Sequence, residues 1–358
     1  MLQPPGLGNL EMYTVRNTLY SVLRRTIGNP LLHIGPIICM PSTPYLSGPF
    51  VAEKAELDDA SHGVAYPIPV ITKCLHPTPP PPPTTIASIY NERSTTYDAA
   101  IFHHRLAEEY IRAAAPQPGA QVLDLACGTG LVTFLAEAQV GPTGTVVGVD
   151  ISEGMLEVAR GKAQRTGSRV TFYQHDISNL SDLDLNPNPG GQDDGAGQFD
   201  LITCAAALVL LPDPLGAIRS WAELLRNGGK LVTDVAARDV HVPARIFEWI
   251  GPQLGLSLQW DQSWVKGEES LAGLLTEAGL EVEKVYVSPV FQVKEYRVEQ
   301  AGELFEQAVS GPMFRNFGVG SVRDKAKRLF VERFVEEAGE EGVLVDEAKM
   351  YIGVAVKR

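Results

Sequence analysis

The sequence predicts a three-layer α/β fold built on a seven-stranded, mostly parallel sheet that is doubly wound, with an antiparallel last strand. Short apolar runs alternate with helical patterns from Val122 onward, and such alternation is typical of parallel βαβ units. A turn containing Gly128 and Gly130 joins the first strand directly to its helix. The last apolar run follows a long return from the parallel strands, so we expect it to run antiparallel to its neighbours.

The strands are assigned to short runs rich in apolar and β-branched residues. They are expected at residues 122–125, 145–150, 170–174, 200–204, 230–235, 282–289 and 349–356. A further strand, or a continuation of the sixth, is expected at 291–296. The first five strands follow the βαβ rhythm, which breaks after Asp234.

Helices are assigned where apolar residues recur every three or four positions. They are expected at residues 99–115, 131–138, 153–166, 215–225 and 271–278, with two more near 298–310 and 322–338. Ser152 is placed to cap the third of these helices, and Asn227-Gly228-Gly229 is a typical stop for the fourth. The apolar face of the first helix is expected to consist of Ile101, Leu106, Tyr110 and Ile111.

Residues 1–85 are predicted to form a disordered or weakly ordered extension, so that the folded domain spans residues 86–358. An uninterrupted proline run at 79–83 favours a stiff polyproline II linker at the end of this extension. Residues 15–27 have the pattern of a short basic amphipathic helix, which is one mark of a mitochondrial presequence. The expected location is the cytoplasm, with the mitochondrial matrix as the alternative.

The composition narrows the possible partners. The formal net charge is -13 and no basic run offsets it, which argues against binding to nucleic-acid phosphates. The four cysteines are widely spaced and form no CxxC pair, so neither a metal site nor a disulfide framework is expected. No apolar run approaches the roughly 20 residues that a membrane-spanning helix needs.

Three features fall where predicted strands end, at the edge where open α/β sheets bind ligands. The first is the glycine turn, where free N–H groups at the start of a helix face a ligand. The second is Asp150, whose carboxylate can accept two hydrogen bonds from a ribose diol. The third is the pair Asp176 and Ile177, which suits an adenine because the carboxylate accepts from the exocyclic amine while Ile177 packs on the ring.

The spacing of the turn distinguishes two kinds of nucleotide-containing cofactor. Nicotinamide dinucleotides call for G-x-G-x-x-G. In that register this chain has Ala126, Gly128 and Leu131, so two glycines are missing and Leu131 would obstruct the approach to a pyrophosphate. The run from Asp124 to Gly130 instead fits the D-x-(G/A)-x-G-x-G pattern of class I methyltransferases, which use S-adenosylmethionine.

From about Tyr97 to its C-terminus, the chain resembles the class I S-adenosylmethionine-dependent methyltransferases, and its core is most similar to the enzymes of ubiquinone and menaquinone C-methylation. Five motifs in order carry the resemblance. They are Val122-Leu-Asp-Leu-Ala-Cys-Gly-Thr-Gly130, Gly148-Val-Asp-Ile-Ser-Glu-Gly-Met-Leu156, His175-Asp176, Phe199-Asp-Leu201 and Leu225-Arg-Asn-Gly-Gly-Lys-Leu231. The resemblance implies a Rossmann-like methyltransferase fold and methyl transfer to a small molecule by in-line displacement.

The resemblance also implies which residues contact the cofactor. Asp124 would lie near the methionine amino group, and Asp150 would bind the ribose hydroxyls. Ile151 and Met155 would flank the adenine. The remaining positions are Asp176 and Ile177 at the adenine edge, and Ala126, Cys127, Gly128, Thr129, Gly130, Cys204 and Ala205 along the methionine portion.

Four positions have two interpretations each. Tyr97 either covers the cofactor, as a tyrosine does in several related enzymes, or is a packing residue. Cys127 and Cys204 are either small buried cysteines or redox or metalloid ligands. His241, just after the fifth strand, is either a base for an acceptor that must lose a proton or a surface histidine.

The expected acceptor is a small, largely apolar metabolite. Residues 205–212, after the fourth strand, are apolar and lack the (N/D/S)-P-P-(Y/F) run of DNA-amine methyltransferases. With the negative charge, this favours a quinone-like, polyketide, terpenoid or alkaloid acceptor from secondary metabolism. The aromatic segment 238–270 is expected to cap a pocket, and residues 238–340 to line much of it.

Two other functions stay open from the sequence. One is a methyltransferase-fold scaffold, or a non-methylating enzyme, that binds the cofactor; the intact cofactor motifs weigh against a scaffold. The other is a nicotinamide oxidoreductase, which Leu131 disfavours. The acceptor atom and the oligomeric state do not follow from these motifs.

Overall fold

The computed structural model of the chain describes residues 83–185, 198–238 and 240–358. The extension predicted over residues 1–85 lies outside the described residues except for its last three positions, and so does all but Pro83 of the predicted proline linker. Helix α2 (Pro83–Arg93) begins within that stretch, and no sequence pattern indicated it. The described fold therefore begins with this helix, slightly before residue 86.

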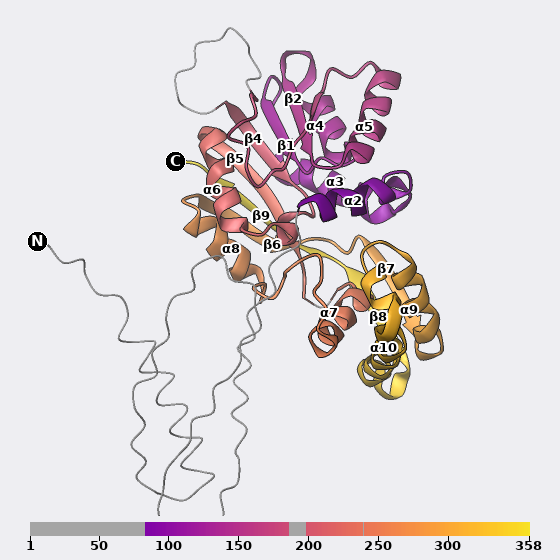
Figure 1. The fold of residues 1–358 in the computed structure, drawn as a ribbon. Coiled ribbons are helices and arrows are strands. Elements are labelled where there is room, and N and C mark those ends of the chain that lie inside the picture. Colours follow the sequence, from indigo (N-terminus) through magenta and orange to yellow (C-terminus); the bar gives the residue numbers. More distant parts are fainter. Residues whose placement is uncertain (1–82, 186–197, 239) are drawn as a thin grey trace, which may run out of the picture. The chain divides into compact units, whose positions relative to one another are not determined.

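A seven-stranded sheet lies at the centre of the described residues, in the order β3-β2-β1-β4-β5-β9-β6 (Figure 1). Neighbouring strands from β3 to β5 are parallel, and β9 is antiparallel to both β5 and β6. This arrangement confirms the predicted fold class and its antiparallel last strand. The strands are β1 (Gln121–Leu125), β2 (Thr145–Asp150), β3 (Thr171–Gln174), β4 (Phe199–Cys204), β5 (Leu225–Ala236), β6 (Glu281–Val287) and β9 (Met350–Val356).

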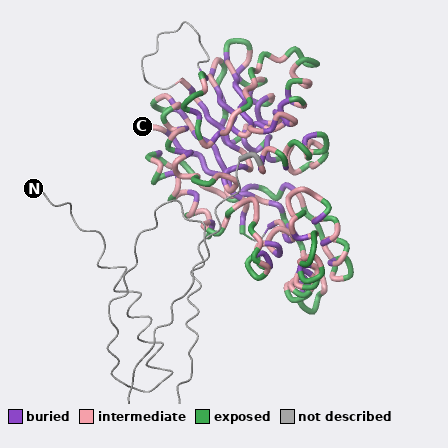
Figure 2. Tube along the Cα trace, in the orientation of Figure 1, coloured by how far each residue is buried: buried purple, intermediate pink, exposed green. Residues whose placement is uncertain are grey.

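Helices cover both faces of this sheet. They are α3 (Ile101–Ala114), α4 (Leu131–Val140), α5 (Glu153–Thr166), α6 (Pro214–Leu224) and α8 (Glu268–Glu277). Successive side chains of a strand point to opposite faces. Val122 accordingly packs in one core with Tyr110 of α3, while the next residue, Leu123, packs in another with Trp221 of α6. Buried residues concentrate along the strands between these two cores (Figure 2).

Two local predictions are wrong. Ile101 is 46% exposed and does not belong to the apolar face of α3, because it opens the helix ahead of the turns that meet the sheet. The helix stop predicted at residues 227–229 belongs to β5, since α6 ends at Leu224. A Cβ on Gly229 would lie 2.8 Å from the Arg226 carbonyl oxygen and 3.0 Å from that of Phe199, so the backbone turns tightly against its neighbours there. That tight turn, rather than a helix end, explains the glycine.

A second group of elements packs around its own core. It comprises α7 (Val242–Leu254), β7 (Gln292–Arg297), α9 (Ala301–Ser310), α10 (Arg323–Ala338) and β8 (Val343–Ala348). Strands β7 and β8 form a separate antiparallel pair, and β8 was not predicted. Phe247 of α7 is fully buried with Phe305 and Phe330 in this core. The predicted cap over 238–270 is therefore partly a core helix, and Trp249 on α7 is 42% exposed.

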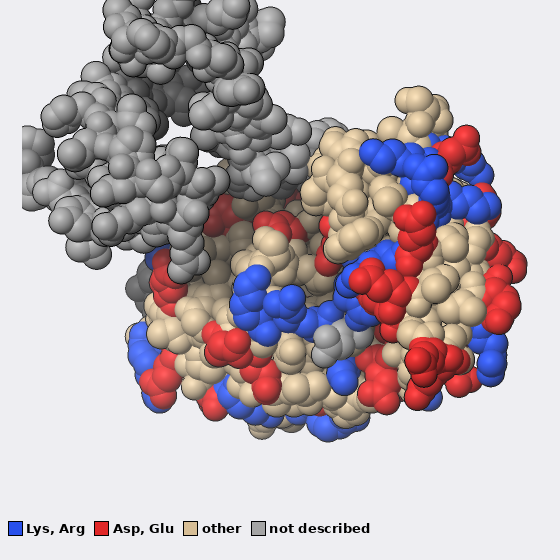
Figure 3. Space-filling model, turned by 90° about the horizontal axis from the view of Figure 1, so that it is seen from below, with Lys and Arg blue, Asp and Glu red and all other residues tan. Residues whose placement is uncertain are grey.

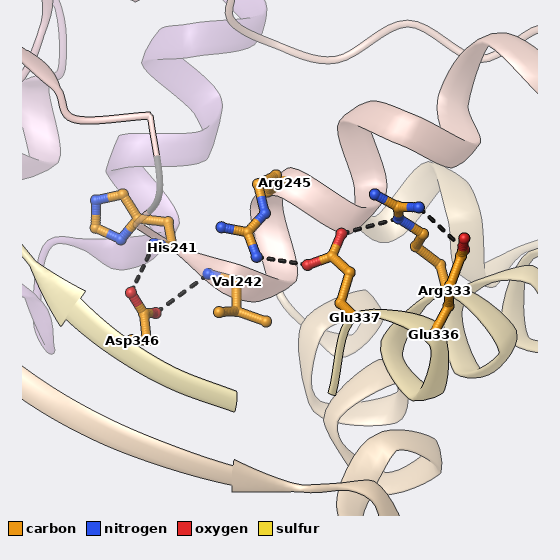
Figure 4. A network of polar contacts seen from close by, with 7 residues as sticks. All are labelled: His241, Val242, Arg245, Arg333, Glu336, Glu337 and Asp346. Atoms are coloured by element: carbon orange, nitrogen blue, oxygen red, sulfur yellow. Dashed lines mark hydrogen bonds and ion pairs between the residues drawn. The ribbon is translucent and has the colours of Figure 1, made fainter. Parts of the chain in front are cut away.

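Asp346 of β8 fixes the start of α7 (Figure 4). Its Oδ1 accepts from the His241 N–H at 2.8 Å, and its Oδ2 accepts from the Val242 N–H at 3.2 Å. These are two of the N–H groups that a helix start leaves unpaired. Further along, Glu337 of α10 accepts from Arg245 of α7 at 2.5 Å, which joins the same helices by a charged contact.

Replacing the Asp346 carboxylate should destabilise this second group of elements. Asp346→Ala leaves two helix-start N–H groups without their acceptor, and we expect it to lower the free energy of unfolding by about 1–2 kcal/mol. Glu347→Ala, the neighbouring exposed position on β8, should change it by less than about 0.5 kcal/mol. Urea unfolding of both variants measures this. Equal stabilities for the two would contradict the capping role.

Candidate functional site

A cavity with about 740 Å³ of open space adjoins the C-terminal ends of β1, β2 and β4, and we call it the strand-edge cavity. A smaller space of about 410 Å³, the inner cavity, lies against the glycine turn. The lining of the strand-edge cavity consists of Ile86, Tyr90, Tyr97, Ala126, Gly128, Asp150, Ile151, Met155, Asp176, Ile177, Ala205, Ala206, Ala207, Leu210, Leu211 and Pro212. The inner cavity shares Tyr97, Ala126, Gly128, Ala205 and Ala206 with it.

Asp150 ties the end of β2 to the turn that follows β1. Its Oδ2 accepts from the Gly128 N–H and its Oδ1 from the Ser152 N–H, both at 2.8 Å. Burial raises the pKa of Asp150, and the backbone N–H groups oppose that shift. A carboxylate has about four acceptor positions. The carboxylate therefore keeps acceptor capacity beyond these bonds, and Asp150 lines the strand-edge cavity.

The glycine turn needs its glycines for different reasons. Gly128 has φ +55°, and a Cβ there would meet no atom within 4 Å. Its backbone therefore lines the cavity without a side chain in front of it. Gly130 has φ +87°, and a Cβ there would lie 2.6 Å from the Phe134 ring. Between them, Thr129 donates from Oγ1 to Asp98 at 2.6 Å, which anchors the turn to the segment before α3. Gly128 therefore shapes the cavity, and Gly130 permits packing of α4.

Asp124 is buried at the inner cavity with its carboxylate held by two hydroxyls. Thr203 donates to Oδ1 at 2.7 Å and Thr133 to Oδ2 at 2.5 Å. Burial raises the pKa of Asp124 to about 6, while the two hydroxyls lower it. At neutral pH the side chain is mostly ionised. It therefore gives the inner cavity a negative wall.

Three aromatic side chains line these cavities: Tyr90 of α2, Tyr97 of the turn between α2 and α3, and His103 of α3. We call them the aromatic group. The Tyr97 ring stacks on His103 with centroids 3.9 Å apart, and Tyr90 lies 6.4 Å from Tyr97. The Arg93 guanidinium lies 5.1 Å from the Tyr90 centroid and 5.5 Å from the Tyr97 centroid, within range of cation–π attraction. Burial lowers the pKa of His103 to about 4, so this imidazole is neutral at physiological pH.

The α2 segment is fastened to the strand edge by Asn91. Its Oδ1 accepts from the Ser152 hydroxyl at 2.7 Å and from the Gly154 N–H at 2.8 Å. Ser152 also caps α5, as predicted, by accepting from the Met155 N–H at 3.2 Å. The aromatic group is thus attached to the same helix start that Asp150 holds.

A larger space of about 1320 Å³, the large cavity, lies between the sheet edge and the second group of elements. It shares Tyr90, Ala206, Ala207 and Leu210 with the strand-edge cavity. Its apolar wall includes Phe102, Phe314, Trp260, Met313 and Met350, and its polar wall includes Arg93, His103, Asp234, His241, Lys294 and Asp346. The two cavities therefore meet at a common wall.

Strained backbone marks two strand ends and one helix start around these cavities. Ala126 and Ala206 each have φ 53°, and His241 has φ 56°. The left-handed region costs a non-glycine residue roughly 1–2 kcal/mol. Such conformations persist where their surroundings fix them, and they cluster at functional sites. The strained residues lie just after β1, just after β4 and at the start of α7, and all three line the cavities.

Most of the predicted contact residues come together here. The strand-edge cavity is lined by Tyr97, Ala126, Gly128, Asp150, Ile151, Met155, Asp176, Ile177 and Ala205, and the inner cavity adds Asp124, Cys127 and Thr129. Gly130 lines neither cavity and serves the helix packing described above. Cys204 also lines neither, contrary to expectation. Its side chain is fully buried in the core with Leu125, because it still follows the alternation of β4.

His241 lines the large cavity and is not a surface histidine. Its ring makes an edge contact with Phe102, with centroids 5.8 Å apart, and burial lowers its pKa. The His241 imidazole that lines this cavity is therefore neutral at physiological pH. Whether it acts as a base stays a prediction.

Several wall residues were not predicted. Tyr90 and Arg93 lie on α2, an element that apolar periodicity did not reveal. Asp98 follows Tyr97 and accepts from Thr129 without lining any of the three cavities. Asp234 lies two residues before the end of β5, and the rule that singled out Asp150, a carboxylate at the end of a strand, would have pointed to it.

Two further observations concern the described ranges, 83–185, 198–238 and 240–358. Within them, no group of three or more His, Cys, Asp or Glu side chains is arranged to hold a metal ion. No helix in these ranges has both the length and the apolar character needed to cross a membrane.

Comparison with known proteins identifies relatives for the sheet and its strand ends. A family model described as a methyltransferase domain matches residues 116–255. The aklanonic acid methyltransferase DauC of Streptomyces sp. (strain C5) is 31% identical over 148 residues, which is 41% of this chain and 62% of the relative. A ubiquinone biosynthesis O-methyltransferase of Xanthomonas axonopodis pv. citri (strain 306) is 31% identical over 180 residues, 49% of this chain and 69% of the relative.

A solved structure is also similar in part. A SAM dependent methyltransferase from Aquifex aeolicus superposes on 50% of this chain and 81% of its own, with 20% identity and a TM-score of 0.37. The match to the Streptomyces relative spans less than two thirds of that protein.

The environment of the two described cysteines predicts low reactivity. Burial raises the pKa of both Cys127 and Cys204, so neither is a thiolate at neutral pH. We expect iodoacetamide to leave both unmodified in the native chain and to modify both in urea, as measured by peptide mass spectrometry. Rapid modification of native Cys127 would contradict this and would favour the redox or metalloid interpretation.

Proposed function

The chain belongs to the S-adenosylmethionine-dependent methyltransferase family, and from that premise we propose that it transfers a methyl group to a small, largely apolar metabolite. S-adenosylmethionine is the cofactor of this family. When bound, it supplies an electrophilic methyl group on a sulfonium sulfur.

The strand-edge cavity has the side chains that an adenosine needs. Asp150 lines this cavity, and its carboxylate keeps acceptor capacity for ribose hydroxyls after bonding Gly128 and Ser152. Ile151, Met155 and Ile177 supply apolar surface for adenine in the same cavity. The bare backbone at Gly128 leaves room that any Cβ would occupy. These observations support binding of the adenosine part of S-adenosylmethionine in the strand-edge cavity.

The inner cavity suits the amino-acid part of the cofactor. The buried Asp124 carboxylate offers a negative group to an ammonium, and the pocket around it is small. Tyr97 and Ala205 line both the inner and the strand-edge cavity, so the two spaces adjoin at these residues. The neutral His103 stacked on Tyr97 adds no repelling charge.

The observation that carries the proposal is the shared wall between the strand-edge cavity and the large cavity. Tyr90, Ala206, Ala207 and Leu210 belong to both. An acceptor in the large cavity would therefore stand next to the donor. For an in-line displacement the protein's contribution is mainly alignment and exclusion of water. The aromatic cover from α2 and the apolar segment after β4 serve both needs.

The large cavity favours a small aromatic or otherwise apolar acceptor. Its wall combines aromatic side chains with a few charged ones, which is typical of small-molecule sites. One relative is named for aklanonic acid and another for ubiquinone biosynthesis, and for this chain we propose a small aromatic or otherwise apolar acceptor. Basic and acidic side chains are interspersed on the face in Figure 3, and the whole chain has a formal net charge of -13, which disfavours a nucleic-acid acceptor.

We also propose a cytoplasmic location, which N-terminal sequencing of the mature protein would test.

Calorimetric titration with S-adenosylhomocysteine tests the donor site. We expect binding by the wild type and a loss of at least about tenfold in affinity for Asp150→Ala, since a hydrogen bond to a charged group contributes about 1.5–3 kcal/mol. Gly128→Leu should weaken binding similarly, because its side chain would enter the cavity. Asp324→Ala, an exposed site on α10, should bind like the wild type. Binding that is absent, or unchanged in both site variants, would refute the donor site.

Methyl tracing tests the transfer itself. Extracts supplied with S-adenosylmethionine labelled in its methyl group should give new labelled small molecules only when active protein is present. The Asp150→Ala variant should lower that label at least about tenfold, in step with its affinity. Turnover of a metabolite without formation of S-adenosylhomocysteine would instead favour the non-methylating alternative.

A further inference from the structure

Asp234 is a buried carboxylate with an unused oxygen at the wall of the large cavity. We propose that it accepts the proton of a phenolic or enolic hydroxyl on the methyl acceptor. The inference rests on the proposed methyl transfer and deepens it by naming the acceptor class, a hydroxylated aromatic or enol whose oxygen receives the methyl group.

The geometry of Asp234 leaves one oxygen for a ligand. The residue lies near the C-terminal end of β5 and is 1% exposed. Its Oδ1 accepts from the Ala206 N–H at 2.8 Å, whereas its Oδ2 is buried and has no hydrogen-bond partner among the described residues. The Tyr110 hydroxyl lies beside this carboxylate, but its single proton is donated to the Cys204 carbonyl oxygen at 2.8 Å. Buried polar atoms nearly always have partners. An unpaired carboxylate oxygen in the lining of a cavity therefore points to a donor that a ligand supplies.

Ala206 connects this carboxylate to the donor site. Its N–H holds Oδ1 of Asp234, and the residue itself lines the strand-edge, inner and large cavities. A hydroxyl that donates to Oδ2 from the large cavity would stand where the cavities meet. A base has to lie within hydrogen-bond reach of the proton that it takes, and this position meets that condition. His241 has no bonded link of this kind to the shared wall.

The surroundings of Asp234 fit the proposed substrate class and the proposed role. Phe102, Trp260 and Phe314 line the same cavity and suit a flat ring. Burial raises the pKa of Asp234 to about 7, while the Ala206 N–H and the Tyr110 hydroxyl lower it. Its carboxylate is thus a stronger base than a solvated one and is still largely ionised slightly above neutral pH.

Other titratable groups face this region from the neighbouring elements. Tyr110 of α3 and Cys204 of β4 lie near Asp234, and burial raises the pKa of each, so both are neutral. Burial lowers the pKa of His103 and of His241, so these imidazoles are neutral as well. The remaining titratable groups nearby are Tyr97, whose pKa burial raises, and the wall residues Tyr90, Arg93, Lys294 and Asp346.

The proposed step balances in atoms and charge. The O–H bond of the acceptor breaks, its proton passes to Oδ2 of Asp234, and the bonding pair stays on the oxygen. That oxygen forms the bond to the methyl carbon, and the pair of the carbon–sulfur bond leaves with the sulfur. The products are a methyl ether, S-adenosylhomocysteine and a neutral Asp234.

Binding of 2-naphthol and of its methyl ether, 2-methoxynaphthalene, tests the hydrogen bond without turnover. With S-adenosylhomocysteine bound to the full chain near pH 8, we expect naphthol to bind at least about tenfold more tightly than the ether. Asp234→Asn can still accept from the Ala206 N–H but places an amide donor at the Oδ2 position, so the preference should disappear. Asp324→Asn, an exposed carboxylate on α10, should keep it.

Methylation of 2-naphthol with S-adenosylmethionine gives the second readout. The wild-type rate should rise with pH through about 7 and then level off, because only ionised Asp234 accepts a proton. Asp234→Asn should be at least about 100-fold slower, with unchanged affinity for S-adenosylhomocysteine. Added formate should restore part of the rate in Asp234→Ala, which a purely structural role would not allow.

The outcomes separate this inference from the proposed function. A wild-type protein that does not bind S-adenosylhomocysteine would refute the proposed function. A wild type that binds it but shows no preference for naphthol over the ether, or the same preference in Asp234→Asn, overturns the role of Asp234 alone. If Asp234→Asn fails to fold in a thermal melt, Asp234→Ala with and without formate decides the question.

Discussion

The Asp150 carboxylate holds together parts of the site that come from different places in the chain. It bonds Gly128 in the turn after β1 and Ser152 at the start of α5, both at 2.8 Å. Ser152 in turn donates to Asn91, the neighbour of Tyr90 on α2. One buried carboxylate thus fixes the bare backbone of the turn and the helix start to which the aromatic cover is fastened. The same carboxylate lines the cavity that these parts enclose.

The walls of the large cavity, which we call the acceptor side, depend on a different set of contacts. The second group of elements has its own phenylalanine core, and Asp346 fixes the start of α7 right after the end of β5. His241 at the start of α7 and Ala206 just after β4 have positive φ, and both line the large cavity. The donor side therefore depends on motifs close in sequence. The acceptor side depends on contacts between residues about a hundred positions apart.

That difference explains how much of the site could be predicted. The sheet, the glycine turn and Asp150 follow from short patterns, because local periodicity and a strand-to-helix turn determine them. Strand β8 and the contacts of Tyr90 depend on distant partners that no single stretch encodes. The Cys204 thiol lines neither cavity because Cys204 is the last residue of β4, and the alternation of that strand turns its side chain into the core. Asp234 was overlooked as a wall residue although its position at a strand end indicated it.

The central claim is that donor and acceptor spaces meet at Ala206, and a crystal structure with S-adenosylhomocysteine tests it most directly. The account predicts ribose hydroxyls on the Asp150 carboxylate, the amino group toward Asp124, and the sulfur directed at the wall shared with the large cavity. A ligand bound elsewhere, or a sulfur directed away from Ala206 so that the large cavity has no access to it, would contradict the account.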